Sequence, residues 1–196
     1  MSGTPTMPAL PSKTPDPDQT KGQPALARSL RVGLISDTHG LLRPEARAFL
    51  QGSDCIVHAG DICGSGILEE LAKIAKVTAV KGNCDQEPWA ARLRETESLR
   101  VGECLLYVIH DLAQMEFEPG IRGIRVVISG HSHKPAVEER HGVLFINPGS
   151  AGPRRFSLPV SVGELVITGN RVTGRTVEVT CGDSLPSGSH PSFSAL

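Results

Sequence analysis

The sequence is poor in aromatic residues and has almost no net charge. Only 4% of its 196 residues are Phe, Trp or Tyr, and the formal net charge at pH 7 is −1. Single strands of nucleic acid bind on stacked aromatic side chains, and every nucleic acid needs many cationic contacts to its phosphates. We therefore predict no extended nucleic-acid binding, and a phosphate-bearing ligand would have to be attracted by a local site.

Long apolar runs and paired cysteine motifs are absent as well. No segment approaches the roughly 20 apolar residues of a membrane span, and the start of the chain has no apolar core of the kind that a secretory signal needs. The five cysteines form no Cys-x-x-Cys pair of the kind used for structural zinc or redox chemistry. These absences predict a cytoplasmic protein with reduced thiols and no membrane partner.

The composition is that of one folded domain between two polar tails. Residues 1–28 and 182–196 are rich in Pro, Ser, Thr and Asp or Gly, and such segments cannot bury enough apolar surface to offset the entropy of ordering. We predict that both tails are disordered. Residues 29–181 are expected to form a single domain, because 39% hydrophobic residues suffice for one core in a chain of this length.

Apolar runs alternate with helical segments in the first half of this domain. Strands are predicted at 30–36, 55–59 and 78–80, and helices at 44–51 and 67–76, where apolar residues recur at helical spacing. This alternation of strand and helix is typical of a mainly parallel sheet with right-handed crossovers.

Beyond residue 98, short strand-like segments replace the helices. They span residues 99–103, 104–110, 126–130, 136–140, 143–147, 161–168 and 171–179. We expect this half to contribute a second, more antiparallel sheet. Two sheets packed face to face and covered by helices predict an α/β fold, a four-layer α/β/β/α sandwich of two mixed sheets flanked by helices.

Residues that can bind a metal follow most of the predicted strands. They are Asp37, His39, Asp61, Asn83, His110, His131 and His133. Open α/β sheets place their ligand sites at strand ends. Asp37 and His39, like His131 and His133, are two residues apart, so in extended chain both side chains of a pair would leave on the same side. The spacing therefore predicts that each pair points into one pocket.

These seven donors exceed the needs of one tetrahedral ion. Their mixture of oxygen and imidazole nitrogen suits manganese, iron, zinc or nickel more than calcium. If Asp61 bridges, the set can hold two divalent cations and leave positions for water. Two cations outweigh the charges of the two carboxylates, so the site would stay cationic and attract a phosphoryl group. Gly60, Gly82 and Gly130, just before ligands, suit tight turns and a close approach of the backbone.

The motifs occur in the order D-x-H, G-D, G-N-C-D, a lone His after a strand, and G-H-S-H followed by N-P-G-S. This order resembles that of the calcineurin-like metallophosphoesterases, and among them the small YfcE-type phosphodiesterases, over roughly residues 31–152. The resemblance implies the four-layer fold, two metal ions (Mn²⁺ first, then Ni²⁺, Fe²⁺, Zn²⁺ or Mg²⁺) and a homodimer or homotetramer. It implies one metal site made of Asp37, His39, Asp61 and His133, and a second made of Asp61, Asn83, His110 and His131.

The resemblance also implies an activity, that of a dinuclear metal-dependent phosphodiesterase. A hydroxide bridging the two metals would hydrolyse a small phosphate ester, with Asp61, Asn83 and His110 as catalytic residues. Many larger relatives carry His directly after the Asn, whereas this chain has Cys84. We interpret the cysteine as favouring diesters or activated esters. The alternatives are a phosphomonoesterase acting on nucleotides or phosphoproteins, and a non-catalytic protein-interaction scaffold such as the retromer subunit of this fold.

Further polar residues are candidates for holding the ligands in place. These candidates are Asp85, Asp111 and His58. Asp111 stands where relatives often carry Gly, and it could orient His110. His58 lies within a predicted strand, which favours a packing role. Arg154 and Arg155 could grip a substrate phosphate through their forked donors, but exposed arginines are usually surface charge, so we leave both out of the site.

Overall fold

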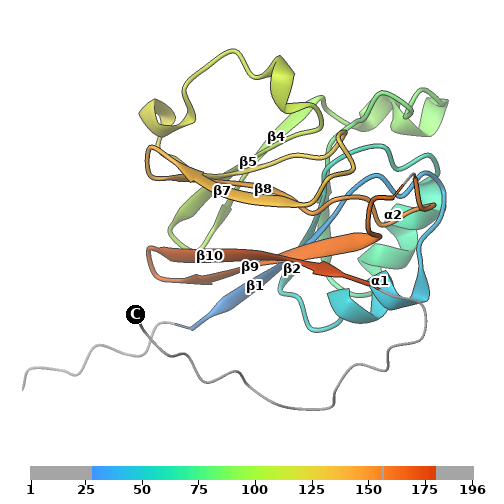
Figure 1. Cartoon of the computed structure of the whole chain (residues 1–196), viewed down its shortest axis with the longest axis horizontal. Coiled ribbons are helices and arrows are strands. Elements are labelled where there is room, and N and C mark those ends of the chain that lie inside the picture. The colour runs from blue at the N-terminus through green and yellow to red at the C-terminus, as the bar shows by residue number, and fades with distance from the viewer. Residues whose placement is uncertain (1–27, 156, 180–196) are drawn as a thin grey trace, which may run out of the picture.

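The computed structural model describes residues 28–155 and 157–179. The predicted tails, residues 1–28 and 182–196, lie outside this part of the chain apart from Arg28. Two five-stranded sheets face each other across a shared apolar core (Figure 1). In the described ranges, no helix is long and apolar enough to cross a membrane.

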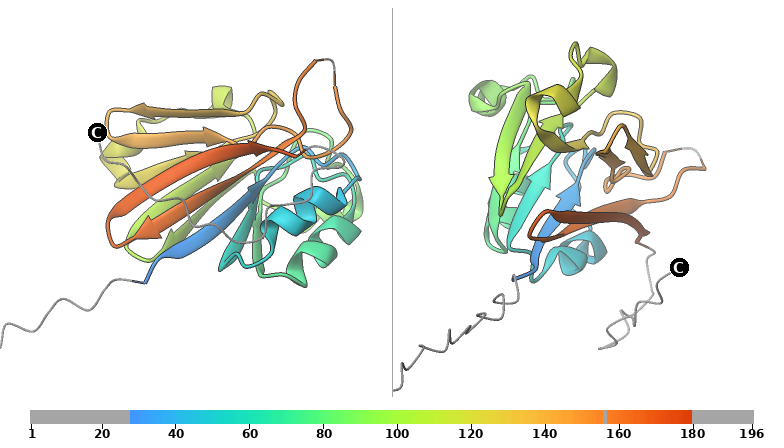
Figure 2. Two further views of the ribbon diagram at one scale, coloured as in Figure 1. Left: turned by 60° about the horizontal axis from the view of Figure 1, so that its bottom comes forward. Right: turned by 90° about the vertical axis from the view of Figure 1, so that its left-hand side faces the viewer.

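The first sheet has the strand order β10-β9-β1-β2-β3. Its strands are β1 (Leu30–Ile35), β2 (Cys55–His58), β3 (Lys76–Ala79), β9 (Ser161–Thr168) and β10 (Arg171–Glu178). β1 and β3 both run parallel to β2, while β9 is antiparallel to β1 and to β10. Helices α1 (Pro44–Leu50) and α2 (Ser65–Ala72) cover the face of this sheet that points away from the second sheet (Figure 2).

The second sheet has the order β4-β5-β6-β8-β7. Its strands are β4 (Thr96–Val101), β5 (Cys104–Ile109), β6 (Ile124–Ile128), β7 (Ala136–Arg140) and β8 (Val143–Asn147). The outer pairs are antiparallel, and β5, β6 and β8 run parallel. On its outer face, apolar residues of the 112–117 segment pack against buried side chains of β5, β6 and β8. This covering layer contains only the short 3-10 helices η2 (Leu112–Gln114) and η3 (Pro119–Arg122).

The predicted fold class, two mixed sheets flanked by helices, is confirmed, but some details differ. The helix predicted to reach residue 76 ends at Ala72, and β3 begins at Lys76 because the β-branched Val77 and Thr78 pair with β2. Segments 161–168 and 171–179 join the first sheet rather than the second. The centre of the second sheet is parallel. Period-two patterning places a strand but does not name its partner, which explains these errors.

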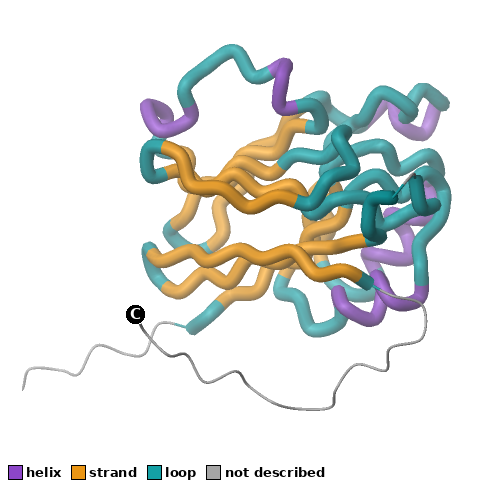
Figure 3. The backbone as a smooth tube through the Cα atoms, in the orientation of Figure 1, coloured by secondary structure: helices purple, strands orange, loops and turns teal. Residues whose placement is uncertain are grey.

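The loops after β1, β2, β3, β5, β6 and β8 gather at one end of the two sheets (Figure 3). Carboxyl ends of parallel strands meet at a common edge, and ligand sites of such sheets form there. The fold therefore brings together loops that are up to about a hundred residues apart in the sequence, and the predicted metal ligands lie on these loops.

Candidate metal centre

All the predicted ligands form a continuous set of contacts at this end of the sheets. The first group consists of Asp37, His39 and His133. His133 Nε2 lies 3.2 Å from Asp37 Oδ1 and 3.2 Å from His39 Nε2. The three ligand atoms lie within 4.8 Å of one another, so one cation could contact them all.

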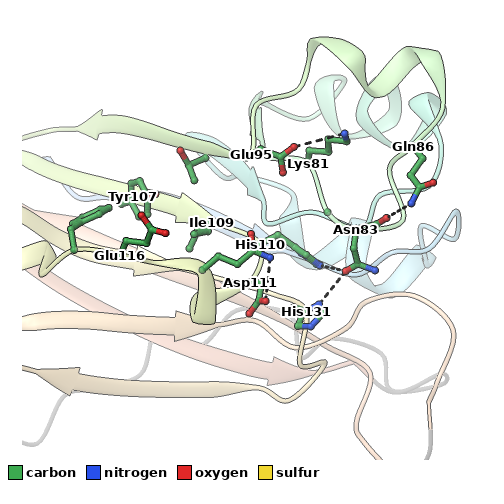
Figure 4. Close-up of a pocket in the computed structure, with 14 residues that line it drawn as sticks. Lys81, Asn83, Gln86, Glu95, Tyr107, Ile109, His110, Asp111, Glu116 and His131 are labelled. Carbon is green, nitrogen blue, oxygen red and sulfur yellow. Dashed lines mark hydrogen bonds and ion pairs between the residues drawn. The ribbon is translucent and has the colours of Figure 1, made fainter.

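The second group consists of Asn83, His110 and His131. Asn83 Oδ1 lies 3.1 Å from His110 Nε2 and 3.1 Å from His131 Nδ1 (Figure 4). His110 Nδ1 lies 2.7 Å from the carbonyl oxygen of Ala59, to which it donates its proton. A neutral His110 therefore presents the lone pair of Nε2 to the lone pairs of Asn83 Oδ1. Such an arrangement is repulsive unless a proton or a cation lies between the atoms.

Asp61 lies between the two groups. Its Oδ2 is 3.8 Å from His39 Nε2, and its Oδ1 is 3.5 Å from His110 Nε2. Burial alone would raise the pKa of this carboxyl, but the neighbouring His110 ring and the hydrogen bond from the backbone N–H of Cys84 outweigh burial and lower it. Asp61 is therefore an ionised carboxylate with one oxygen toward each group, which is the position that a bridging ligand requires.

The backbone of the ligand loops is left-handed rather than extended. Seven non-glycine residues of the described chain have positive φ, and six belong to this centre: Asp37, His39, Asp61, Cys63, His131 and His133. Each such residue costs roughly 1–2 kcal/mol. The extended-chain argument for the two spaced pairs was therefore wrong in its geometry, although each pair does point into the centre. Strain of this kind concentrates at functional sites.

Glycines allow the ligand loops to approach one another closely, as predicted. A Cβ atom on Gly82 would lie 2.2 Å from the backbone nitrogen of Asp61. A Cβ on Gly60 would lie 2.6 Å from His110 Nδ1, and one on Gly130 would lie 2.0 Å from Ser36 Oγ. No side chain fits at these positions without moving a loop that carries a ligand.

Asp85 ties two ligand loops together. Its buried carboxylate accepts hydrogen bonds from the backbone N–H groups of Ile62, Cys63 and Gly82 at 2.7–2.9 Å. One side chain thus joins the loop that follows β2 to the loop that follows β3. Asp85 supports the centre through the backbone and not through a contact with a ligand side chain.

Asp111 does not orient His110, contrary to the hypothesis drawn from its position. Its carboxylate accepts from the N–H of Ala113 at 3.0 Å and from Gln114 Nε2 at 3.3 Å, so it caps η2. The carbonyl of Ala59 orients the His110 ring instead. A sequence pattern of side chains could not reveal this partner, because it is a backbone atom.

His58 is a packed residue, as its position within a strand indicated. It is fully buried, and burial lowers its pKa to about 3. Since Thr38 donates its hydroxyl to the carbonyl of Ile62, His58 Nε2 donates to Thr38 Oγ1 at 3.0 Å. Thr38 separates Asp37 from His39, so the neutral imidazole fixes the peptide between two ligands.

The loop after β8 supports two of the ligand loops through hydrogen bonds, one after β1 and one after β6. Asn147 Nδ2 donates to the carbonyl of Gly130 at 2.6 Å, and Ser150 Oγ donates to the carbonyl of Asp37 at 2.9 Å. The loop therefore fixes the backbone at Asp37 and at Gly130, which directly precedes His131.

The residues of the first group fit a divalent cation. Asp37 is fully buried, and its Oδ1 has no hydrogen-bond partner among the residues that the structure describes, which is costly for a buried polar atom. Burial raises the pKa of Asp37 to about 6. Burial, and then the charge of Arg155, lower the pKa of His39 and lower that of His133 to about 4, so both rings stay neutral as metal ligands must.

An open cavity of about 660 Å³ adjoins the second group (Figure 4). Besides Asn83, His110 and His131, its lining includes Tyr107 and Phe117, whose rings meet edge to face at 5.1 Å. Lys81 and Glu95 also line the cavity and form an ion pair at 3.8 Å. The cavity has room for an organic group attached to a phosphate.

Two features of the centre escaped the sequence analysis. Arg155, interpreted as surface charge, lies near enough to His39 and His133 for its charge to lower their pKa values. Cys63 places Sγ 3.6 Å from His39 Nδ1. Their positions, shortly after N-P-G-S and two residues after Asp61, were the only available signals.

Comparison with known proteins gives a consistent assignment. Residues 30–169 match the family model of the calcineurin-like phosphoesterase superfamily domain. A probable metallophosphoesterase of Methanothermobacter thermautotrophicus is 37% identical over 158 residues, which cover 74% of this chain and 91% of that protein. Phosphodiesterase YfcE of Escherichia coli is 29% identical over 166 residues, which cover 69% of this chain and 87% of that protein.

A solved structure shows the same fold. Vacuolar protein sorting 29 from Cryptosporidium parvum aligns with a TM-score of 0.67 at 23% sequence identity, and the alignment covers 79% of this chain and 94% of that one. At this identity the likeness concerns the arrangement of sheets and helices alone.

Proposed function

This chain belongs to the calcineurin-like phosphoesterase superfamily, as the order of its motifs indicated, and we propose that it is a phosphodiesterase that works with two divalent cations, manganese foremost. The observation that carries the proposal is the position of Asp61, an ionised carboxylate with one oxygen toward each donor group. When bound, the cations would supply Lewis acidity and lower the pKa of water toward neutrality.

Residues of the chain would hold and orient the two cations. The first group would take one cation through Asp37, His39 and His133, and the second group would take the other through Asn83, His110 and His131. The hydrogen bond from His110 Nδ1 to the Ala59 carbonyl keeps Nε2 directed at Asn83 and Asp61. This fixed orientation spares the site any rearrangement when the substrate arrives.

Arg155 is proposed to bind the substrate phosphate. Its side chain is exposed, and its charge reaches the first donor group. A guanidinium presents a planar fork of donors that matches two phosphoryl oxygens. Arg155 would therefore balance the charge that develops on these oxygens during hydrolysis.

Cys84 supports a diester rather than a monoester as substrate. Burial, and then the charge of Asp61, raise the pKa of this thiol above its usual value, so it is a poor proton donor to a leaving alcohol. A monoester of an ordinary alcohol depends most on such a donor. The cavity beside the second group offers space for one of the alcohol groups of a diester.

A non-catalytic scaffold is the second candidate, favoured by the structural likeness to vacuolar protein sorting 29. Both candidates share the fold, so activity decides between them. The complete set of ligands and the buried Asp37 Oδ1 without a hydrogen-bond partner support the enzyme.

The experiment that tests the proposal compares bis-p-nitrophenyl phosphate with p-nitrophenyl phosphate, using metal-stripped protein resupplied with manganese. We expect manganese-dependent cleavage of the diester, and a loss of roughly 10²–10³-fold in Asn83→Ala, because a group acting on the developing charge is removed. The matched control is Asp111→Asn, which alters a half-buried residue lining the same cavity whose carboxylate bonds to Ala113 and Gln114, and which should retain activity. Manganese binding without cleavage of either ester would favour the scaffold.

A further inference from the structure

A second cluster of metal-binding donors lies on the other side of the His39 ring. His39 Nδ1, Cys63 Sγ and Cys84 Sγ lie within 4.8 Å of one another. His39 Nε2, by contrast, faces His133 and Asp61. The ring therefore separates the proposed dinuclear centre from a pair of thiols, with one nitrogen toward each.

The spacing between Cys63 and His39 matches that of two ligands around a tetrahedral ion. Zinc lies about 2.3 Å from a thiolate sulfur and about 2.0–2.1 Å from an imidazole nitrogen, which at a tetrahedral angle places the two ligand atoms about 3.6 Å apart. Cys63 Sγ lies 3.6 Å from His39 Nδ1. Both cysteines are exposed, so an ion could enter from solvent and take water as its fourth ligand.

The architecture of the loops fixes these thiols beside each other. Cys63 follows Asp61 by two residues, and Cys84 directly follows Asn83. Asp85 holds the two loops together by accepting hydrogen bonds from the backbone N–H groups of Cys63 and Gly82. Cys63 also adopts a left-handed φ of 57°, a conformation that costs free energy and is typical of functional loops.

The donor chemistry differs from that of the dinuclear centre. Two sulfurs and one imidazole form a soft set that prefers zinc, cadmium or copper(I), whereas carboxylates, an amide and imidazoles accept manganese. The two kinds of ion should therefore distribute between the two places according to ligand type.

We propose that His39, Cys63 and Cys84 form a third metal site, for a thiophilic cation of the zinc class, which shares the His39 ring with the dinuclear centre. Binding replaces the proton of each thiol, and the proton on Nδ1 when Nε2 is already coordinated, and the released protons pass to solvent. No electron transfer is involved. The site does not depend on the protein being a phosphodiesterase.

Cadmium provides the first test, because its bonds to thiolates give an ultraviolet charge-transfer absorption that bonds to carboxylate or imidazole lack. Full-length protein carrying Cys181→Ser, loaded with manganese, is titrated with cadmium. We expect the absorption to saturate at one equivalent per chain and to disappear in Cys63→Ser and in Cys84→Ser. The control variants Cys55→Ser and Cys104→Ser should retain it.

Zinc protection provides the second test on the unaltered chain, so that misfolding of a variant cannot obscure the result. Iodoacetamide labelling of Cys63 and Cys84, followed by mass spectrometry, should slow at least tenfold with zinc and stay unchanged with manganese. The proposal requires both results. Absorption that survives both serine substitutions, or thiols that zinc leaves unprotected, would overturn it, whatever the activity on phosphate esters.

Discussion

The two donor groups differ in their exposure to solvent. In the first group Asp37 and His133 are buried and His39 is half-buried, whereas in the second group Asn83 and His131 are exposed beside the cavity while His110 is buried. Buried ligands that are fixed by several loops suit permanent retention of an ion. Exposed ligands beside a cavity suit an ion that meets the substrate. We propose from this difference that the first group would retain its ion and the second would present its ion to the substrate.

Asp61 lies between the two groups with one oxygen toward each, so its loss should have the largest effect. Asp61→Asn keeps the shape and removes the charge that faces both groups. We expect a fall in diester hydrolysis of roughly 10³-fold or more, since each of the proposed cations would contribute several kcal/mol to stabilising the transition state. Steady-state kinetics at saturating manganese measure this. An active Asp61→Asn variant would show that the two groups work independently.

The burial of Asp37 predicts a pH dependence that is specific to the first group. Its pKa is about 6 in the folded protein against 3.8 ordinarily, because burial penalises the charge. Between these values the metal-free folded protein holds a proton that the unfolded chain has released, so its stability falls as pH rises. The loss should reach about 3 kcal/mol above pH 6.

Asp37→Asn removes this titration, so the difference in unfolding free energy between the variant and the unaltered protein isolates the contribution of Asp37. Relative to unaltered protein in a chelator, the variant should gain about 3 kcal/mol in unfolding free energy between pH 3 and pH 7, about 2 kcal/mol of it between pH 4 and pH 6. His133 titrates oppositely in this range, with a pKa lowered to about 4, but is present in both proteins. Denaturant unfolding measures the difference, and a difference independent of pH would contradict the burial argument.

The close approach of the loops that follow β2 and β3 sets the position of the second group. Alanine substitutions at two glycines test this requirement. Gly82→Ala places a Cβ 2.2 Å from the backbone nitrogen of Asp61, and should lower the unfolding free energy by about 2 kcal/mol or more. Gly66→Ala in α2, where no atom lies within 4 Å of the added Cβ, should raise it by about 0.5–1 kcal/mol. Equal effects in thermal unfolding would show that the close approach is not required.

The smallest expected effect concerns substrate preference beside the second group. Cys84→His supplies an imidazolium that can protonate a leaving alcohol, and should raise the ratio of monoester to diester hydrolysis by about tenfold. Cys84→Ser is the matched control, since a hydroxyl supplies no such acid. An unchanged ratio in Cys84→His would remove the reason for linking this residue to diester preference.

Sequence patterns predicted the donor residues that meet at one end of the sheets and most of the strands that carry them, because residue type and apolar runs are local properties. They did not predict the partners of β9 and β10, which depend on contacts between distant segments. The left-handed backbone at His39 and Cys63 was also missed, since only tertiary contacts hold L residues there. The Ala59 carbonyl, which orients His110, leaves no trace in a pattern of side chains.

The most direct test of the account is the number and coupling of manganese ions. Metal-stripped protein would be dialysed against manganese, then analysed for metal content and by electron paramagnetic resonance. The account predicts two ions per chain with the signature of an exchange-coupled pair, and loss of that coupling in Asp61→Asn. A single uncoupled ion in the unaltered protein, or coupling that survives Asp61→Asn, would contradict a dinuclear centre bridged by this carboxylate.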